Sequence, residues 1–465
     1  MKDKIYNSHS IIADKSNIEL FNYLNMSSRC AKNLKNKVIF NYRQIISASH
    51  KGFVDLQQNQ LDVLSNFELI MDDINSIRAK NKKQLVKKIG STYYFPSYEH
   101  MEALFKLFKD DLYYELPVQT AQQIVKNAYK DFKSWFKGSK DYKINPSKYK
   151  GKPKMPYYIE KEKITFTITN QDAVIKETIN AEGIKQYELK LPKTKISINL
   201  GTTLPEGKLK EVKVVPYYDT FKIQLIFSKE FTFIKRDSKR IVGIDPGINN
   251  FATISNNIGL SPILIKGTVI KSKNQLFNKN LAQFKSELPL NVFSSKKIEK
   301  MFKNRDLFNS DYYHKVSGYI VNYCVLNNID TIVIGKNKQW KTAINIGKVN
   351  NQNFVNIAHS TFIFMIKYKA YKNNINVIET EESYTSKASF LDNDDIPTYG
   401  KTKVVPTFSG NRIKRGLYKS KDNTIINADI NGASNIIKKA FINAFKLITN
   451  YDYLLNPKVI AYKNL

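Results

Sequence analysis

The hydrophobic period of the sequence changes twice, and these changes constrain the fold more than any other feature of the chain. Between residues 17 and 137, apolar side chains recur every three to four positions, which predicts a helical region. Between residues 157 and 236, apolar and polar side chains alternate among turn signals, which predicts a small antiparallel β-barrel. From residue 237 to residue 465, predicted strands and helices alternate, as in a mixed sheet flanked by helices. The expected fold class is therefore multidomain α+β.

Turn residues and charge set the boundaries between these regions. Residues 1–16 are expected to contribute the first part of the β domain. Gly138 is expected to end the last helix of the helical region, because glycine commonly follows a helix C-terminus. Residues 138–156 are too polar and too rich in proline and glycine for either period, which predicts a basic linker, either a solvated hinge or a phosphate-binding segment. Asp219 and Thr220 are predicted to form a hairpin turn. The candidates for phosphate contact in the linker are Lys148, Lys150, Lys152 and Lys154.

The charge of the chain points to a polyanionic partner. The sequence has 74 Lys and Arg against 41 Asp and Glu, a formal net charge of +33 that opposes compaction unless a polyanion offsets it. Nucleic acid is the first candidate, since no basic amphipathic helix beside an apolar anchor indicates a membrane partner. Only eight of the basic residues are Arg, which favours contact with the phosphate backbone over reading of base edges. Two distant cysteines and an N-terminus without an apolar core predict an intracellular protein of a reducing compartment. The expected location is cytoplasmic, of bacterial type and associated with the nucleoid.

Two aspartates stand where a strand is predicted to end and where a helix is predicted to begin. Asp245, in IVGIDPG, follows four mostly buried positions of a predicted strand. Asp429, in NADINGASN, is expected just before a helix N-terminus, where the helix dipole favours a carboxylate. A nuclease of the two-metal type needs carboxylates from separate elements to hold two Mg²⁺, and oxygen ligands suit this ion. Each segment alone fits an ordinary turn or a helix cap equally well.

Together, three segments in the order GIDPGINNFATIS, SYTSK and DINGASNI resemble RuvC-type RNase H domains. The closest likeness is to TnpB, the family of RNA-guided nucleases of insertion sequences that is related to the type V CRISPR effectors. The resemblance covers residues 240–445 and implies a RuvC-like nuclease domain over residues 237–465. More loosely, it implies that the helical region is a recognition domain and the β region a wedge domain. Asp245 and Asp429 would then be catalytic metal ligands.

The resemblance departs at the second catalytic motif. TnpB has a Glu at the end of the fourth core strand, and the matching residue in DTIVIGKNKQW is Gly335. In some relatives, Fanzor among them, this Glu lies just before the Thr-Ser segment, a position that Glu382 in ETEESYTSK matches. Glu382 is therefore the third expected catalytic and metal-binding residue. Glu379 and Glu381 are expected on the opposite face if the strand reaches that far, but a bulge would turn Glu381 inward, so the choice between Glu381 and Glu382 stays open.

A second departure concerns zinc. The family has two Cys-x-x-Cys pairs between the Thr-Ser segment and the last Asp, and here the first pair falls on Ser389 and Asp392. A degenerate zinc-ribbon-like insertion is therefore expected over residues 387–427, with no zinc. Arg412 and Arg415, in FSGNRIKRGLY, lie close in sequence to the last motif and are candidate phosphate contacts.

The resemblance implies an RNA-guided DNA endonuclease, whose guide RNA derives partly from the transposon end and pairs with target DNA. The expected cofactors are two Mg²⁺, for which Mn²⁺ can substitute, bound by Asp245, Glu382 and Asp429. Two other interpretations stay open. One is a nuclease-inactive, RNA-guided DNA-binding protein that acts as a repressor, which Gly335 favours, and the other is a DNA transposase with the same core. The sequence leaves the guide scaffold, the flanking target motif and the oligomeric state undetermined.

Overall fold

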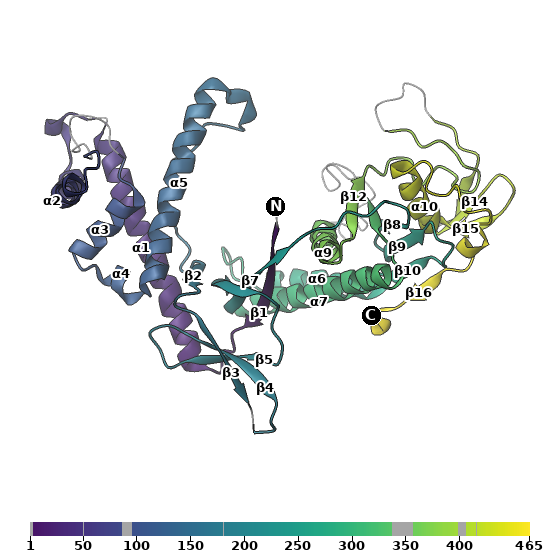
Figure 1. Ribbon diagram of the computed structural model, residues 1–465, viewed down its shortest axis with the longest axis horizontal. Helices are drawn as coiled ribbons and strands as arrows, with labels where there is room; N and C mark the ends of the chain where they lie inside the picture. The colour runs from purple at the N-terminus through teal and green to yellow at the C-terminus, as the bar shows by residue number, and fades with distance from the viewer. Residues whose placement is uncertain are drawn as a thin grey trace. The chain divides into compact units, whose positions relative to one another are not determined.

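The computed structural model describes most of the chain and divides it into two compact units (Figure 1). Unit 1 is Met1–Phe231 and unit 2 is Thr232–Leu465. The described residues are 3–49, 51–85, 95–179, 181–336, 357–398, 406–414 and 416–465.

Helices make up the first part of unit 1. The two longest, α1 and α5, contact each other and share one apolar core (Figure 1). The predicted apolar stripe of α5 faces that core, with Ala121, Val125, Ala128 and Phe132 buried and Trp135 half-buried. The helical elements of unit 1 are α1 (Ile18–Ala48), η1 (Phe53–Asp55), α2 (Gln58–Lys80), α3 (Tyr98–Leu107), α4 (Asp111–Glu115), α5 (Val118–Ile144) and η2 (Pro146–Lys148).

The last of these helices is longer than the sequence predicts. α5 continues through Gly138 to Ile144, so the prediction that Gly138 ends it is wrong. A glycine inside a helix costs only about 1 kcal/mol relative to alanine, which packing against the rest of the unit can offset. Pro146 supplies the actual stop, because the residue before a proline avoids helical angles, and Asn145 has φ −130° and ψ 62°. The helix therefore ends at Ile144 and not at Gly138, and the short 3-10 helix η2 follows it.

The strands of unit 1 form two antiparallel sheets. The first has the order β1-β7-β6-β2, so the N-terminal strand and the late strands of the unit share one sheet, and the second has the order β3-β4-β5. The single barrel predicted from alternation is therefore not what these described strands form. The reason is a turn after Thr169, beyond which β3 pairs with β4 and not with β2. The strands are β1 (Asp3–Ile12), β2 (Phe166–Thr169), β3 (Val174–Ile179), β4 (Lys185–Lys190), β5 (Ser197–Gly201), β6 (Lys208–Tyr217) and β7 (Thr220–Phe231).

The hairpin between β6 and β7 turns one residue earlier than predicted. Tyr217 pairs with Thr220, so the turn residues are Tyr218 and Asp219, and the predicted pair Asp219-Thr220 is wrong by one position. Tyr218 has φ 52°, the left-handed conformation that two-residue hairpin turns require at their first position.

Unit 2 is built on a mixed sheet of six strands in the order β12-β11-β8-β9-β10-β16. β11 runs parallel to both β8 and β12, whereas β9 is antiparallel to β8 and β10. The short edge strand β16 has no counterpart among the predicted strands. The strands of this sheet are β8 (Ile241–Pro246), β9 (Asn250–Asn256), β10 (Ile263–Lys266), β11 (Thr331–Gly335), β12 (Asn376–Thr380) and β16 (Lys458–Ile460).

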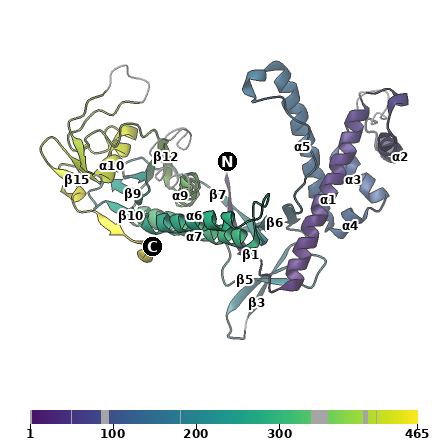
Figure 2. The ribbon, with the colours of Figure 1, turned by 180° about the vertical axis from the view of Figure 1, so that it is seen from behind.

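Helices cover both faces of this sheet (Figures 1 and 2). α7 and α9 pack with Ile244 and Ile332 in one core, whereas α10 packs against Val333 and Leu264 from the other face. α6 runs beside α7 (Figure 2). None of the described helices is both long and apolar enough to cross a membrane. The helical elements of unit 2 are α6 (Thr268–Ser286), α7 (Lys296–Leu326), α9 (His359–Lys372), α10 (Ala428–Ala440), η3 (Asp452–Leu454) and η4 (Tyr462–Asn464).

A small three-stranded antiparallel sheet precedes α10 in the chain. Its order is β13-β14-β15, and β15 leads directly into the helix. The strands are β13 (Asn411–Lys414), β14 (Leu417–Lys419) and β15 (Ile425–Asn427). This sheet therefore delivers the chain to the N-terminus of the helix that carries Asp429.

Candidate metal centre

The two predicted aspartates line one cleft of unit 2, with a volume of about 520 Å³. Asp245 lies near the end of β8, and Asp429 lies in the first turn of α10. Asn250, Lys266 and Arg412 line the same cleft. The two aspartates are 184 positions apart in the chain, and the fold brings their carboxylates to one cleft together with an amide and two cations.

Asp429 does not cap its helix. The sequence predicts that it lies just before the N-terminus of the helix, but α10 begins one residue earlier, at Ala428. The cap is Asn427, whose side-chain oxygen accepts the backbone N–H groups of Asp429 at 2.9 Å and Ile430 at 3.3 Å. Because Asn427 satisfies these donors, the carboxylate of Asp429 is available to the cleft.

Close packing of α10 on the sheet brings the two aspartates together. A Cβ atom at Gly243 would lie 2.4 Å from the carbonyl oxygen of Ala433, a distance that real Cβ atoms do not show. A Cβ at Gly432 would lie 2.8 Å from a carboxylate oxygen of Asp245. The absence of side chains at both glycines therefore lets the first turns of α10 lie against β8 and the Asp245 carboxylate.

Glu382 reaches the end of β11, beside the place where the family has its glutamate. β11 ends at Gly335, and a Cβ there would lie 3.1 Å from Oε2 of Glu382. Ile334 pairs with Ile244 in the parallel register, which puts Gly335 level with Asp245 on the neighbouring strand. The carboxylate of Glu382 therefore lies where a side chain at residue 335 would begin.

The two neighbouring glutamates have other partners. Glu379 forms ion pairs with Lys336 at 2.9 Å and with Lys367 at 2.8 Å. Lys439 lies 2.5 Å from Glu381, and the backbone N–H of Ser383 also donates to that carboxylate. Burial acts to raise the pKa of Glu381, but these hydrogen bonds and the charge of Lys439 outweigh it and hold the pKa below its usual value.

The expectation that these glutamates alternate between the two faces of a strand does not apply to all three. β12 ends at Thr380, so Glu381 and Glu382 follow the strand and do not belong to it. The expectation that Glu381 and Glu382 point to opposite faces was made for a strand that continues to these residues, so it does not apply here. The buried ammonium of Lys439, on α10, is what binds the Glu381 side chain.

Helix α10 also fixes the segment that follows Glu382. Asn435 donates to the carbonyl oxygens of Thr385 and Ala388, both at 2.8 Å. Asn431 donates to Ala388 at 2.8 Å and accepts the N–H of Phe390 at 2.9 Å. Residues 431 and 435 lie on one face of the helix because they are four positions apart. The DINGASN segment thus holds both an aspartate and the chain that carries the glutamate.

Negative charge accumulates around Asp245. Removal from water raises the pKa of this carboxyl well above its usual value, and the charges of Glu382 and Asp429 raise it further, whereas Arg412 acts in the opposite direction. Carboxylate oxygens are the ligands that Mg²⁺ prefers, so the chemistry of the donors fits this ion. In the described part of the chain, however, no three Asp, Glu, His or Cys side chains are already grouped as one metal site.

The carboxylate of Asp429 is held from two sides. Asn250, at the start of β9, donates its amide to Oδ2 of Asp429 at 2.7 Å, and Lys266 donates to the amide oxygen of Asn250 at 3.0 Å. Arg412, on β13, lies 3.5 Å from Oδ1 of Asp429. Sequence reasoning did not find Asn250 or Lys266. The predicted Arg415 lies outside the described residues.

Hydrogen bonds join the predicted zinc-ribbon-like insertion at the positions where cysteines would lie. The backbone N–H of Ser389 donates to Asp394 at 2.7 Å, and the N–H of Asp392 donates to the hydroxyl of Ser389 at 3.3 Å. Asp394 also accepts the N–H of Ser409 at 3.0 Å, and Asp392 accepts that of Lys421 at 2.9 Å. Carboxylates that accept backbone N–H groups therefore connect these loops.

The four linker lysines belong to unit 1, whereas the carboxylate cleft is lined by residues of unit 2. Lys148 is 3.8 Å from Asp141, and Lys150, Lys152 and Lys154 are exposed.

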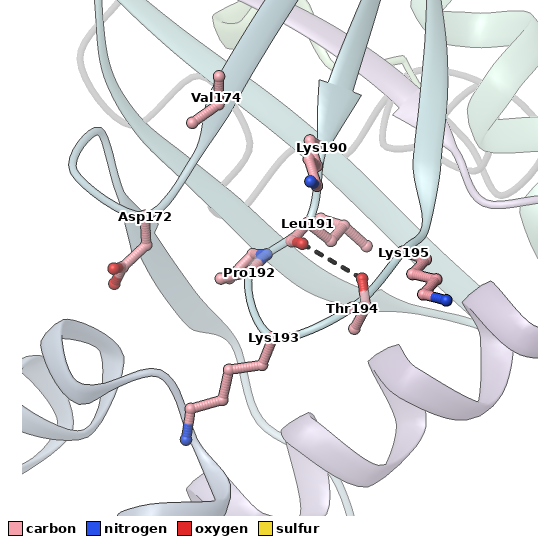
Figure 3. Close-up of a pocket in the computed structure, with 8 residues that line it drawn as sticks. All are labelled: Asp172, Val174, Lys190, Leu191, Pro192, Lys193, Thr194 and Lys195. Atoms are coloured by element: carbon pink, nitrogen blue, oxygen red, sulfur yellow. Dashed lines mark hydrogen bonds between the residues drawn. The ribbon is translucent and has the colours of Figure 1, made fainter.

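A second hollow, of about 560 Å³, lies in unit 1 (Figure 3). Among the described residues that line it, Asp172 is the only carboxylate, and Lys193 donates to the carbonyl oxygens of Tyr114 at 2.5 Å and Leu116 at 2.9 Å. A site for two divalent cations needs several converging carboxylates, so this hollow is not the metal centre. The lining residues are Asp172, Val174, Lys190, Leu191, Pro192, Lys193, Thr194 and Lys195.

Two family models match the unit that contains the carboxylate cleft. Residues 234–341 match OrfB_IS605, described as a probable transposase, and residues 359–436 match the Cas12f1-like TNB domain. The chain is TnpB-like. Asp245 falls within the first match, and Glu382 and Asp429 fall within the second, in the order that the three motifs predict.

Solved structures with low similarity to this TnpB-like chain include CRISPR effectors. The Cas12f1 chain of a complex with guide RNA and target DNA is 13% identical over 93% of this chain and 98% of its own, with a TM-score of 0.32. The mini-RNA-guided endonuclease CRISPR-Cas_phi3 is 11% identical over 94% of this chain and 92% of its own, with a TM-score of 0.38. No curated protein matches the sequence. At these TM-scores the assignment rests on the family models.

Proposed function

We propose that this protein is an RNA-guided DNA endonuclease encoded by an insertion sequence, with Asp245, Glu382 and Asp429 as the ligands of two Mg²⁺. The observation that carries the proposal is the meeting of Asp245 and Asp429 at one cleft, with the carboxylate of Glu382 beside Gly335 on the neighbouring strand. Asp245 lies on β8, Asp429 lies on α10, and Glu382 lies in the segment that follows β12, so the three carboxylates come from separate parts of unit 2. That is the arrangement that two-metal phosphodiester hydrolysis requires.

The charge of the chain supports nucleic-acid partners. A net charge of +33 favours association with polyanions, and base pairing by a guide RNA leaves the protein to bind backbones and duplex shape. The partners are therefore a guide RNA derived from the transposon end, and target DNA. The TnpB-like family match supports this pair of partners.

The residues of the cleft have distinct roles in this proposal. The bound Mg²⁺ ions would supply an activated water and offset charge on the leaving oxygen, and Mn²⁺ would substitute. Asn250 and Lys266 keep the Asp429 carboxylate turned toward the cleft. Arg412 pairs with Asp429 without substrate, and we infer that it transfers to a phosphate of the bound strand.

A nuclease-inactive, RNA-guided DNA-binding protein is the second candidate, and one observation favours it. Arg412 already lies 3.5 Å from Asp429, so a cation of the chain itself offsets the charge of one proposed metal ligand. A DNA transposase is the third candidate, because the first matching family is described as a probable transposase. A transposase would join a cut DNA end to a second DNA, whereas a nuclease would leave free ends.

Divalent metal is expected to control cleavage. Protein purified with its native RNA should cut a matched DNA in Mg²⁺ or Mn²⁺, should fail in EDTA, and should be indifferent to a zinc-selective chelator, because the proposed ligands are all oxygens. Gel analysis of labelled matched and mismatched DNA measures this. Sequence-matched binding without cleavage in Mg²⁺ would establish the binding-only candidate, and joined DNA products would establish the transposase.

Asn250 is expected to tune both metal binding and rate. Asn250→Ala removes the donor to Asp429, and loss of such an outer partner of a metal ligand lowers affinity or activity about 10- to 100-fold. Cleavage kinetics and Mn²⁺ binding followed by electron paramagnetic resonance measure the two effects. Asn450→Ala is the matched control, since Asn450 also donates its amide to an aspartate, Asp452 at 2.6 Å, but does not line the cleft, and both values should stay within about twofold. Unchanged Mn²⁺ affinity in Asn250→Ala would refute the role.

A further inference from the structure

A segment of unit 1 without helix or strand, residues 152–164, runs along α1 and is fixed to it through its backbone. Asn36 donates to the carbonyl of Ile159 at 3.0 Å and accepts its N–H at 2.8 Å. The hydroxyl of Ser28 makes the same pair of bonds with Ile164, at 2.7 Å and 3.0 Å. Each side chain thus satisfies both backbone groups of one residue, which fixes the path of the segment without a sheet partner.

Tyr157 projects from this fixed segment into solvent. Its side chain is 66% exposed, although the residue lies between two anchored positions. The guanidinium of Arg43, on α1, lies 5.0 Å from the centre of the Tyr157 ring and donates to the carbonyl of Pro156 at 2.9 Å. The ring of Tyr158 packs on the core of the unit and meets that of Tyr157 edge-on at 5.5 Å. An exposed aromatic ring is therefore held in place by its neighbours.

The chain just before Tyr157 combines a fixed backbone with exposed cations. The indole N–H of Trp135, on α5, donates to the carbonyl of Pro153 at 3.2 Å, and this bond holds the chain between Lys152 and Lys154 against the helix. Lys152 and Lys154, on either side of that anchor, are exposed, and within the described chain neither forms an ion pair. A single-stranded polynucleotide carries phosphates next to exposed bases. Exposed cations next to a fixed aromatic ring are therefore suited to bind such a strand, with the cations on the phosphates and the ring on a base.

We propose that Tyr157, supported by Arg43, stacks on an unpaired nucleobase, while Lys152 and Lys154 contact the phosphates of the same strand. The proposal rests on the nucleic-acid partners of the proposed function but not on the carboxylate cleft. Stacking suits this position because every base has a π-face, so the site accepts any sequence. The guanidinium behind the ring adds a positive charge that favours an electron-rich base on the open side.

The test measures binding of fluorescein-labelled oligouridine of about 12 nucleotides by the full chain freed of its own RNA, in EDTA. Tyr157→Ala should weaken binding about 5- to 50-fold, whereas Tyr157→Phe should stay within about twofold because the ring is kept. Tyr6→Ala is the matched control, since Tyr6 is a similarly exposed tyrosine of the same unit, on β1, and should bind as wild type.

Salt dependence separates stacking from charge. Tyr157→Ala should lower the association constant equally at every salt concentration, because no phosphate contact is lost. Lys152→Gln and Lys154→Gln should each reduce the slope of log K against log salt by about 0.7, the value for one phosphate contact on a single strand. A Tyr157→Ala variant with a shallower slope, or a Tyr157→Phe variant as weak as Tyr157→Ala, would overturn the stacking role.

The outcomes distinguish this inference from the proposed function. Steep, salt-dependent RNA binding that Tyr157→Ala leaves unchanged would sink the stacking site alone. Failure of the wild-type chain to bind any polynucleotide would remove both. Repeating these measurements with oligothymidine shows whether the site binds RNA or DNA. A loss of affinity in Tyr157→Ala for oligouridine alone assigns the site to RNA. Equal losses for both oligonucleotides show that it accepts either type of strand.

Discussion

Glu382→Gln is expected to lower the rate of target cleavage about a thousandfold or more, while RNA-guided binding of target DNA stays intact. The amide keeps the shape of the side chain but removes the charge that offsets the bound cations. A loss of several kcal/mol of charge stabilisation corresponds to a rate factor of about that size. Asp245→Ala and Asp429→Ala should have the same effect. Single-turnover cleavage measures the rate, and a mobility shift with matched DNA measures binding.

The two neighbouring glutamates provide the controls. Glu379→Gln should cut within about threefold of wild type, because Glu379 is paired with Lys336 and Lys367 away from the cleft. Glu381→Gln should cut similarly, because the amide still accepts from Lys439. If Glu382→Gln cuts at the wild-type rate and Glu381→Gln does not, the ligand is Glu381 and the assignment made here is wrong.

Sequence periodicity predicted the helices and strands well, but it predicted poorly which strands pair with one another. The buried strands of unit 2 were recognisable because each is a short apolar run with turn residues on both sides, as in β8 and β11. In unit 1, the alternation of apolar and polar side chains identified the strands but not their pairing. This pattern shows which face of a strand is buried, but it does not show which neighbouring strand forms the hydrogen bonds. Two sheets and one barrel therefore give the same pattern.

The aspartates of the candidate site could be predicted, but the groups that hold them could not. Asp245 and Asp429 stand in motifs whose local structure is recognisable from glycines and helix signals. Asn250 bonds to Asp429 across 179 positions of sequence, and a single asparagine at the start of a strand carries no signal of such a partner. Lys266 contacts Asp429 only indirectly, by donating a hydrogen bond to Asn250, and nothing in the sequence around Lys266 indicates this role.

Gly335 connects the departure from the family pattern to the packing of the site. Its missing side chain leaves space that the carboxylate of Glu382 and the side chain of Ile436 share. A Cβ at this position would lie 3.1 Å from Oε2 of Glu382 and 2.6 Å from Cδ1 of Ile436. Both neighbours would have to move, and the movement of Glu382 is the one that matters for chemistry. A glutamate supplied from residue 382 therefore requires that residue 335 stay small.

Gly335→Ala is accordingly expected to slow target cleavage about 10- to 100-fold, because displacing a catalytic group by a fraction of an ångström to 1 Å costs factors of this order. Overpacking should also destabilise unit 2 by about 1–3 kcal/mol. Adding Ile436→Val removes the atom 2.6 Å away but leaves the contact with Glu382, so the double variant should regain thermal stability without regaining rate. Thermal melting and single-turnover cleavage, with Ile436→Val alone as the control, separate the two effects. A double variant that recovers both would show that Gly335→Ala acts only through packing, and that the Glu382 carboxylate has no required place beside residue 335.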